Sequence, residues 1–174
     1  MARPEAANSP FVQRVVIGVG DLAVSNNLEV VLSTYALGSC IGVVAFDPAA
    51  RAGGMLHLML PDSAIAPERA AKQPALFADT GLEMFFRSLG SLRCEPGNIR
   101  LVVAGGASVL GGPDPYRIGE RNSSVTLDFL TKRGYAVRHT IVGGGVNRAL
   151  HLDMATGFVT LRTPKEDAYF ALSE

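Results

Sequence analysis

Residues 40–46 (CIGVVAF) are apolar at both odd and even positions, and this run limits the possible folds more than any other segment. A strand with one face in water alternates apolar and polar side chains, so the run indicates a strand covered on both faces. The other predicted strands are short and rich in apolar or β-branched residues, and they span 11–19, 28–36, 55–60, 99–104, 136–142, 147–152 and 157–162. Thr156–Gly157 is expected to form the turn between the last two.

Two segments have the periodicity of a helix. Residues 75–89 place their Leu and Phe side chains on one helical side. Residues 122–133 are the second predicted helix, with Asn122 or Ser123 as its N-cap and Gly134 as its end. The early strands follow one another without intervening helices, which does not fit a doubly wound fold. The prediction is an α/β fold with two main helices and a sheet that is mixed or antiparallel in its first half.

The composition indicates one folded domain. Apolar residues make up 48% of the 174 residues and charged residues 18%, as in a chain with a hydrophobic core. We expect a single domain at 11–162, a flexible N-terminal tail at 1–10 and a C-terminal tail at 163–174. Acidic and basic residues balance at 16 each and Trp is absent, so we expect no nucleic acid partner. Neither a signal peptide nor a membrane span is recognisable, which predicts a cytoplasmic protein without direct membrane insertion.

A predicted hairpin brings a cysteine and a histidine together. The sequence Asp-Pro-Ala-Ala at 47–50 is typical of a type I turn. If the first and last of these residues face each other across a hairpin, Cys40 faces His57. Directly opposed residues have Cβ atoms about 4.5–5.5 Å apart, which suits a thiol–imidazole pair. Gly53–Gly54 could host a bulge, and a slip of one residue would move His57 to the other face.

Cys40 and His57 are a candidate nucleophile and base. An imidazole can take the thiol proton and leave a thiolate–imidazolium pair, the reactive form of a catalytic cysteine. Gly38 and Ser39 leave backbone N–H groups near Cys40 that could bind an oxyanion or the substrate. Thr34 has a hydroxyl that could orient His57 or contact a substrate amide. Inert packing of both residues is the other interpretation, and the residues alone leave the two level.

Longer segments of the chain resemble the CheD family. The shared segments are 37–40 (LGSC), Asp47–Pro48, 53–61 (GGMLHLMLP), 105–107 (GGA), 118–122 (IGERN) and Thr156–Gly157. Each of these segments is unspecific alone, but their joint order is specific. The resemblance spans roughly residues 30–162, which is nearly the whole chain.

The resemblance implies a three-layer α/β sandwich with mixed, largely antiparallel sheets. It also implies a cysteine-dependent amidohydrolase, a protein-glutamine glutaminase that converts selected glutamines to glutamate in the cytoplasmic helical region of chemoreceptors. By position, Cys40 resembles the nucleophile, His57 the general base and acid, and Thr34 the third polar member of the site. Some family members bind a CheC-type phosphatase, so a stoichiometric regulator of that phosphatase or of a receptor is the alternative function. A cysteine protease or a transglutaminase would use the same nucleophile.

Asn147 and His151 depart from the family pattern, which usually has Gly before Arg148 and an apolar residue at 151. Asn can adopt a left-handed turn, so Asn147 could replace that Gly. Both departures bear on receptor choice or partner binding. Arg121 and Asn122 could stabilise a loop around the site or cap the second helix, and the sequence leaves these two roles open.

No cofactor or metal is expected. The three histidines lack ligand spacing such as HxH or HExxH. The glycine runs at 105–106 and 143–145 lack the features of a phosphate-binding loop, so we expect tight turns near the active site instead. Cys94 is expected to be an incidental loop thiol.

Overall fold

Two five-stranded sheets form most of the computed structural model, which describes residues 12–109 and 114–174. Sheet A has the order β1 (Gln13–Val16), β3 (Val30–Leu37), β8 (Arg148–Asp153), β9 (Phe158–Arg162) and β10 (Asp167–Ala171). Sheet B has the order β2 (Asp21–Ser25), β5 (Ala52–Leu58), β4 (Ile41–Asp47), β6 (Arg100–Gly105) and β7 (Ala136–Val142). The β1–β3 and β6–β7 pairs are parallel and the other strand pairs of the described residues are antiparallel. The predicted mixed, largely antiparallel sheets are confirmed.

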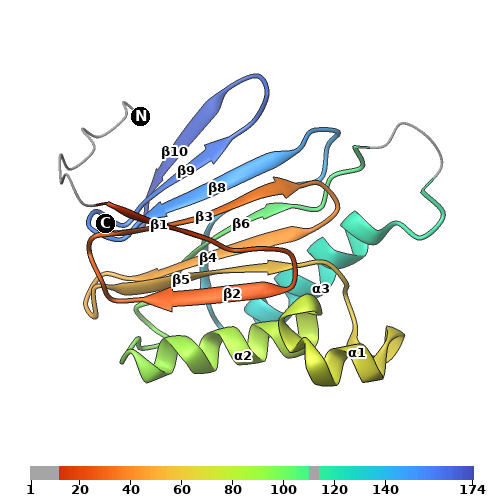
Figure 1. Ribbon diagram of the computed structural model, residues 1–174, viewed down its shortest axis with the longest axis horizontal. Coiled ribbons are helices and arrows are strands. Elements are labelled where there is room, and N and C mark those ends of the chain that lie inside the picture. The colour runs from red at the N-terminus through yellow and green to blue at the C-terminus, as the bar shows by residue number, and fades with distance from the viewer. Residues whose placement is uncertain (1–11, 110–113) are drawn as a thin grey trace.

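Sheet B is the middle of three layers, with sheet A on one side and the helices on the other (Figure 1). The helices are α1 (Pro67–Lys72), α2 (Ala78–Ser91) and α3 (Ile118–Lys132). Val43 of β4 shares a hydrophobic cluster with Leu82 of α2, whereas its neighbour Val44 belongs to the cluster between the sheets. Every residue of β4 is buried, as the apolar run at 40–46 predicts. The three-layer α/β sandwich with two main helices is therefore confirmed.

The C-terminal segment is part of sheet A. The sequence predicts a tail at 163–174, whereas β10 pairs with β9 along its whole length. Leu172 is fully buried, and its N–H donates to the Gly157 carbonyl at 3.0 Å. This segment is not a free tail. The N-terminal tail predicted at 1–10 lies outside the described residues.

The second main helix, α3, begins four residues before its predicted start at 122. Asn122 and Ser123 therefore lie inside the helix, and the prediction that one of them is the N-cap is wrong. Arg117 precedes the helix in a left-handed conformation with φ 48°. Gly134 follows its end with φ 72°, which confirms the predicted stop. Across the described ranges, none of the helices has the length and apolarity needed to cross a bilayer.

Candidate active site

The β4–β5 hairpin has a register two residues away from the prediction. Gly42, and not Cys40, lies opposite His57, and the ladder begins with Asp47 opposite Ala52. It runs without a bulge through the two glycines that follow. A two-residue shift keeps every side chain on its face, so Cys40, which directly precedes the ladder end at Ile41, lies two residues from the partner of His57.

The loop between these strands explains the shift. The Asp47 carboxylate accepts the N–H groups of Ala49 and Ala50 at 2.9 and 3.1 Å. Arg51 then takes a left-handed conformation with φ 49°. The aspartate therefore organises a four-residue loop at 48–51, where the sequence predicts a two-residue one.

His57 is buried between the two sheets and is held by Thr34 of β3 in the opposite sheet. Thr34 Oγ1 lies 2.8 Å from His57 Nδ1 and 2.7 Å from the Ile17 carbonyl oxygen. A carbonyl only accepts, so the single hydroxyl proton goes to Ile17, and His57 Nδ1 must carry the proton that Thr34 accepts. The other ring nitrogen, Nε2, is then unprotonated in the neutral ring. Nε2 is buried and has no partner among the described residues, so its lone pair is free to accept a proton.

Cys40 is partly exposed, and its side chain packs against the core between the sheets. Met55 belongs to the same core and lies two residues before His57 on β5, so His57 points into this layer as well. Cys94 lies in the helix-side core instead. Burial and the nearby Asp47 carboxylate raise the pKa of the Cys94 thiol to about 11. The sheets therefore bring Cys40 and His57 into one layer and leave Cys94 outside it.

Burial keeps both members of the candidate pair neutral near pH 7. It lowers the pKa of His57 from 6.5 to about 4. It also raises the pKa of the Cys40 thiol, against a smaller downward effect of the hydrogen bond from the Cys40 backbone N–H. Both shifts disfavour the thiolate–imidazolium pair that the sequence suggests. These two pKa shifts favour proton transfer from Cys40 to His57 during attack on a substrate rather than before it.

The backbone donors near the thiol are those of Ser39 and Cys40. The N–H of Gly38, a predicted oxyanion donor, is occupied because it donates to the Ala36 carbonyl at 2.9 Å. Within residues 12–109 and 114–174, the N–H groups of Ser39 and Cys40 have no acceptor in another residue. The absence of a side chain at Gly38 leaves room for Asn147, because a Cβ at this position would lie 3.0 Å from Asn147 Oδ1.

Asn122 stabilises the loop around the site, the first of the two roles that the sequence leaves open. Its Nδ2 donates to the carbonyl oxygens of Ser39 and Met59, at 2.9 and 2.8 Å. Arg121, the next residue on α3, is exposed. Because α3 begins at Ile118, Asn122 lies inside the helix and on its buried face. A helix predicted to start at 118 would have placed this polar side chain toward the sheet.

The role of Arg148 was not apparent from the sequence. Its guanidinium is buried and donates to the carbonyl oxygens of Gly143, at 2.8 Å, and of Gly105 and Val146, each at 3.4 Å. The glycine runs that it joins have positive φ at Gly105, Gly106, Gly143 and Gly144, which confirms the predicted tight turns. A Cβ on Gly105 would lie 2.1 Å from the Cys40 carbonyl oxygen. Arg148 thus holds the turn next to residues 38–40, the loop that carries Cys40.

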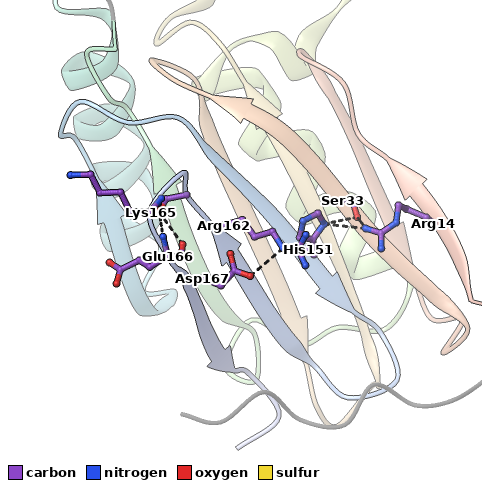
Figure 2. Close-up of polar contacts among 8 residues, drawn as sticks. Arg14, Ser33, His151, Arg162, Lys165, Glu166 and Asp167 are labelled. Carbon is purple, nitrogen blue, oxygen red and sulfur yellow. Dashed lines mark hydrogen bonds and ion pairs between the residues drawn. The ribbon is translucent and has the colours of Figure 1, made fainter.

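Of the two departures from the family pattern, Asn147 lies beside Gly38, and His151 lies in β8. His151 is on the outer face of sheet A, where its Nδ1 lies 2.9 Å from Ser33 Oγ and 3.2 Å from Arg14 Nη1 (Figure 2). Burial, aided by Arg14, lowers the pKa of His151 to about 4. Asn147 does not have positive φ, so the prediction of a left-handed turn there is wrong. No cluster of three metal-ligating side chains occurs in the part of the chain that the structure describes.

Known proteins resemble this chain closely. The CheD family model, described as CheD chemotactic sensory transduction, matches residues 59–163. A Syntrophus aciditrophicus protein named "Probable chemoreceptor glutamine deamidase CheD 1" is 38% identical over 149 residues, which cover 86% of this chain and 93% of that protein. The Anaeromyxobacter dehalogenans protein "Probable chemoreceptor glutamine deamidase CheD 2" is 40% identical over 149 residues, which cover 86% and 94%. A crystal structure of the Bacillus licheniformis hypothetical protein YfiH superimposes with a TM-score of 0.39 at 15% identity over 78% of this chain and 61% of that one, a likeness too distant to inform the fold or the site.

Proposed function

Because the chain belongs to the CheD family, we propose that it is a glutamine deamidase of chemoreceptors, acting in the cytoplasm through Cys40, His57 and Thr34. Its substrates are glutamine side chains in the cytoplasmic helical region of the receptors, which it hydrolyses to glutamate. One observation carries the chemistry. The Thr34–His57 hydrogen bond leaves His57 Nε2 unprotonated in the layer that also receives the Cys40 side chain.

The first step is attack by Cys40 on the glutamine carboxamide. As the bond from sulfur to carbon forms, His57 Nε2 takes the thiol proton, and the carbonyl electron pair moves to oxygen. In this proposal the N–H groups of Ser39 and Cys40, which have no acceptor in another described residue, bind the oxyanion. One such donor is typically worth about 100- to 1000-fold in rate.

Collapse of the tetrahedral intermediate releases ammonia. The protonated His57 gives its proton to the leaving nitrogen, the carbon–nitrogen bond breaks, and a thioester to Cys40 remains. The lowered pKa of His57 makes its protonated form a better proton donor than an ordinary imidazolium, which favours this transfer. Water then attacks the thioester while His57 takes a proton from it. The carbon–sulfur bond breaks, and the sulfur regains its proton as glutamate leaves.

The test is incubation of the purified protein with receptor cytoplasmic fragments, followed by mass spectrometry of the glutamine-bearing peptides. The wild-type protein should produce the mass gain of Gln-to-Glu conversion, and Cys40→Ala should produce none while its melting temperature is retained. Conversion at the wild-type rate by Cys40→Ala refutes the assignment. Tight binding without a mass change would favour a stoichiometric partner of a receptor or of a CheC-type phosphatase. Cleaved or cross-linked fragments would favour a protease or a transglutaminase.

A further inference from the structure

Asn122 joins the loop that carries Cys40 to the end of the strand that carries His57. It is fully buried, and its Nδ2 donates to the carbonyl oxygens of both Ser39 and Met59. Carbonyl oxygens only accept, so the amide orientation follows from its partners, because Oδ1 in that position would face two acceptors. Met59 follows His57 by two residues. One amide group therefore connects the two halves of the candidate site.

The contact with Ser39 determines the direction of the Cys40 N–H. The Ser39 carbonyl and the Cys40 N–H belong to one planar trans peptide, in which they point in opposite directions. Because Asn122 holds the carbonyl toward α3, the N–H points away from that helix. It lies close enough to the Cys40 sulfur to lower the pKa of the thiol, against the larger upward effect of burial. This donor is thus next to the atom that attacks the substrate.

The carbonyls on either side of Ser39 are held as well. The Gly38 carbonyl accepts the N–H of Ala107, and the Cys40 carbonyl accepts the N–H of Gly106, each at 2.8 Å. Three successive carbonyls of the loop that carries Cys40 are therefore held by the segment after β6 and by α3. Of these three contacts, the one to Ser39 comes from a side chain, so it can be removed by substitution.

We propose that Asn122 is a positioning residue that acts through the Ser39 carbonyl to aim the Cys40 N–H at the oxyanion formed during attack on the substrate amide. This role rests on the proposed deamidase function. A donor that is fixed in advance stabilises developing charge without reorganisation, so its misdirection slows the reaction rather than substrate binding.

Asn122→Ala separates this role from others because Cys40 has two measurable reactions. Deamidation of a receptor fragment passes through an oxyanion, whereas alkylation by iodoacetamide does not. We expect kcat for deamidation to fall about 10- to 1000-fold, with KM and the alkylation rate nearly unchanged. Thr126→Val is the matched control, since Thr126 lies one turn later on α3, is fully buried and has a hydroxyl without a partner among the described residues. It should keep both wild-type rates.

Two results overturn the proposal. One is an unchanged kcat in folded Asn122→Ala, and the other is an equal loss of kcat and alkylation rate, which would mean that Asn122 acts on the Cys40–His57 pair. If Asn122→Ala is unfolded at the assay temperature, Asn122→Leu, whose branched side chain fills the site without any donor, decides by the same criteria. A wild-type protein without deamidation, or Cys40→Ala with it, refutes the deamidase function itself. Full activity in Asn122→Ala refutes the positioning role alone.

Discussion

Replacement of Thr34 by Val removes one hydroxyl, keeps the shape of the side chain and tests whether Thr34 sets the tautomer of His57. The hydroxyl donates to the Ile17 carbonyl at 2.7 Å and accepts the His57 Nδ1 proton at 2.8 Å. Without the hydroxyl, His57 Nδ1 loses the acceptor that keeps the ring proton on this nitrogen. The proton can move to Nε2, and the ring then has no lone pair for the thiol proton of Cys40.

The magnitudes follow from these two contacts. Leaving a buried hydrogen-bonding group without a partner costs about 1–3 kcal/mol, and Thr34→Val leaves the Ile17 carbonyl and one ring nitrogen of His57 in that state. General base catalysis contributes about 100- to 10,000-fold to rate. We therefore expect a lower melting temperature and a drop in kcat of about 100-fold or more. KM should change little, because the Thr34 hydroxyl is already engaged by the Ile17 carbonyl and by His57.

The assay is steady-state ammonia release from receptor fragments, with thermal melting on the same preparations. Thr34→Ser is the matched control, since it retains the hydroxyl and should keep most of the kcat. The reasoning is refuted if folded Thr34→Val has the kcat of the wild-type protein. It is equally refuted if Thr34→Ser loses as much kcat as Thr34→Val, since shape and not the hydroxyl would then matter.

Three further predictions concern charge and packing. The alkylation rate of Cys40 in the free protein should rise with pH through the neutral range, because burial raises the thiol pKa; a plateau from acidic pH would instead indicate a preformed ion pair. The folded protein binds fewer protons at His57 than the unfolded chain does between pH 6.5 and about 4, so its free energy of unfolding should fall as the pH falls through this range. His57 contributes about 3 kcal/mol to this loss and His151, whose pKa is lowered in the same way, adds to it, so urea titrations should show a loss that is about 3 kcal/mol smaller in His57→Gln than in the wild-type protein. Gly105→Ala should lower the melting temperature and abolish deamidation, since its Cβ would lie 2.1 Å from the Cys40 carbonyl oxygen and its φ is 118°.

The layered fold was predictable because burial leaves a pattern in the sequence. A strand such as β4, which is covered on both faces, cannot carry polar residues at alternate positions, and α2 shows its apolar face plainly. The elements that the sequence did not reveal, β2, α1 and β10, are short and partly exposed. Side chains at such positions are weakly constrained by burial, so their pattern does not distinguish an edge strand from a loop or a tail.

The sequence predicts which strand face carries the side chains of the site, but not how far apart those side chains lie. The turn sequence at 47–50 predicts that Cys40 and His57 lie on the same face of the hairpin, and this survives a two-residue change of register. The register itself depends on how the Asp47 carboxylate binds the loop backbone, which no pattern shows. The contacts of Thr34 and Asn122 join segments far apart in the chain, and they exist only after the layers have packed.

Gly42 shows how closely the packing and the chemistry depend on each other. Glycine weakens an isolated strand, yet this one lies in the middle of the doubly covered β4, directly opposite His57. A Cβ at this position would lie 2.8 Å from side-chain atoms of Leu37 and Leu150, both from sheet A. Any larger residue would therefore displace these leucine side chains from the layer that also holds the imidazole. The Thr34–His57 hydrogen bond spans the same gap at 2.8 Å, so the absence of a side chain at Gly42 leaves room for the leucines beside the contact that sets the tautomer of His57.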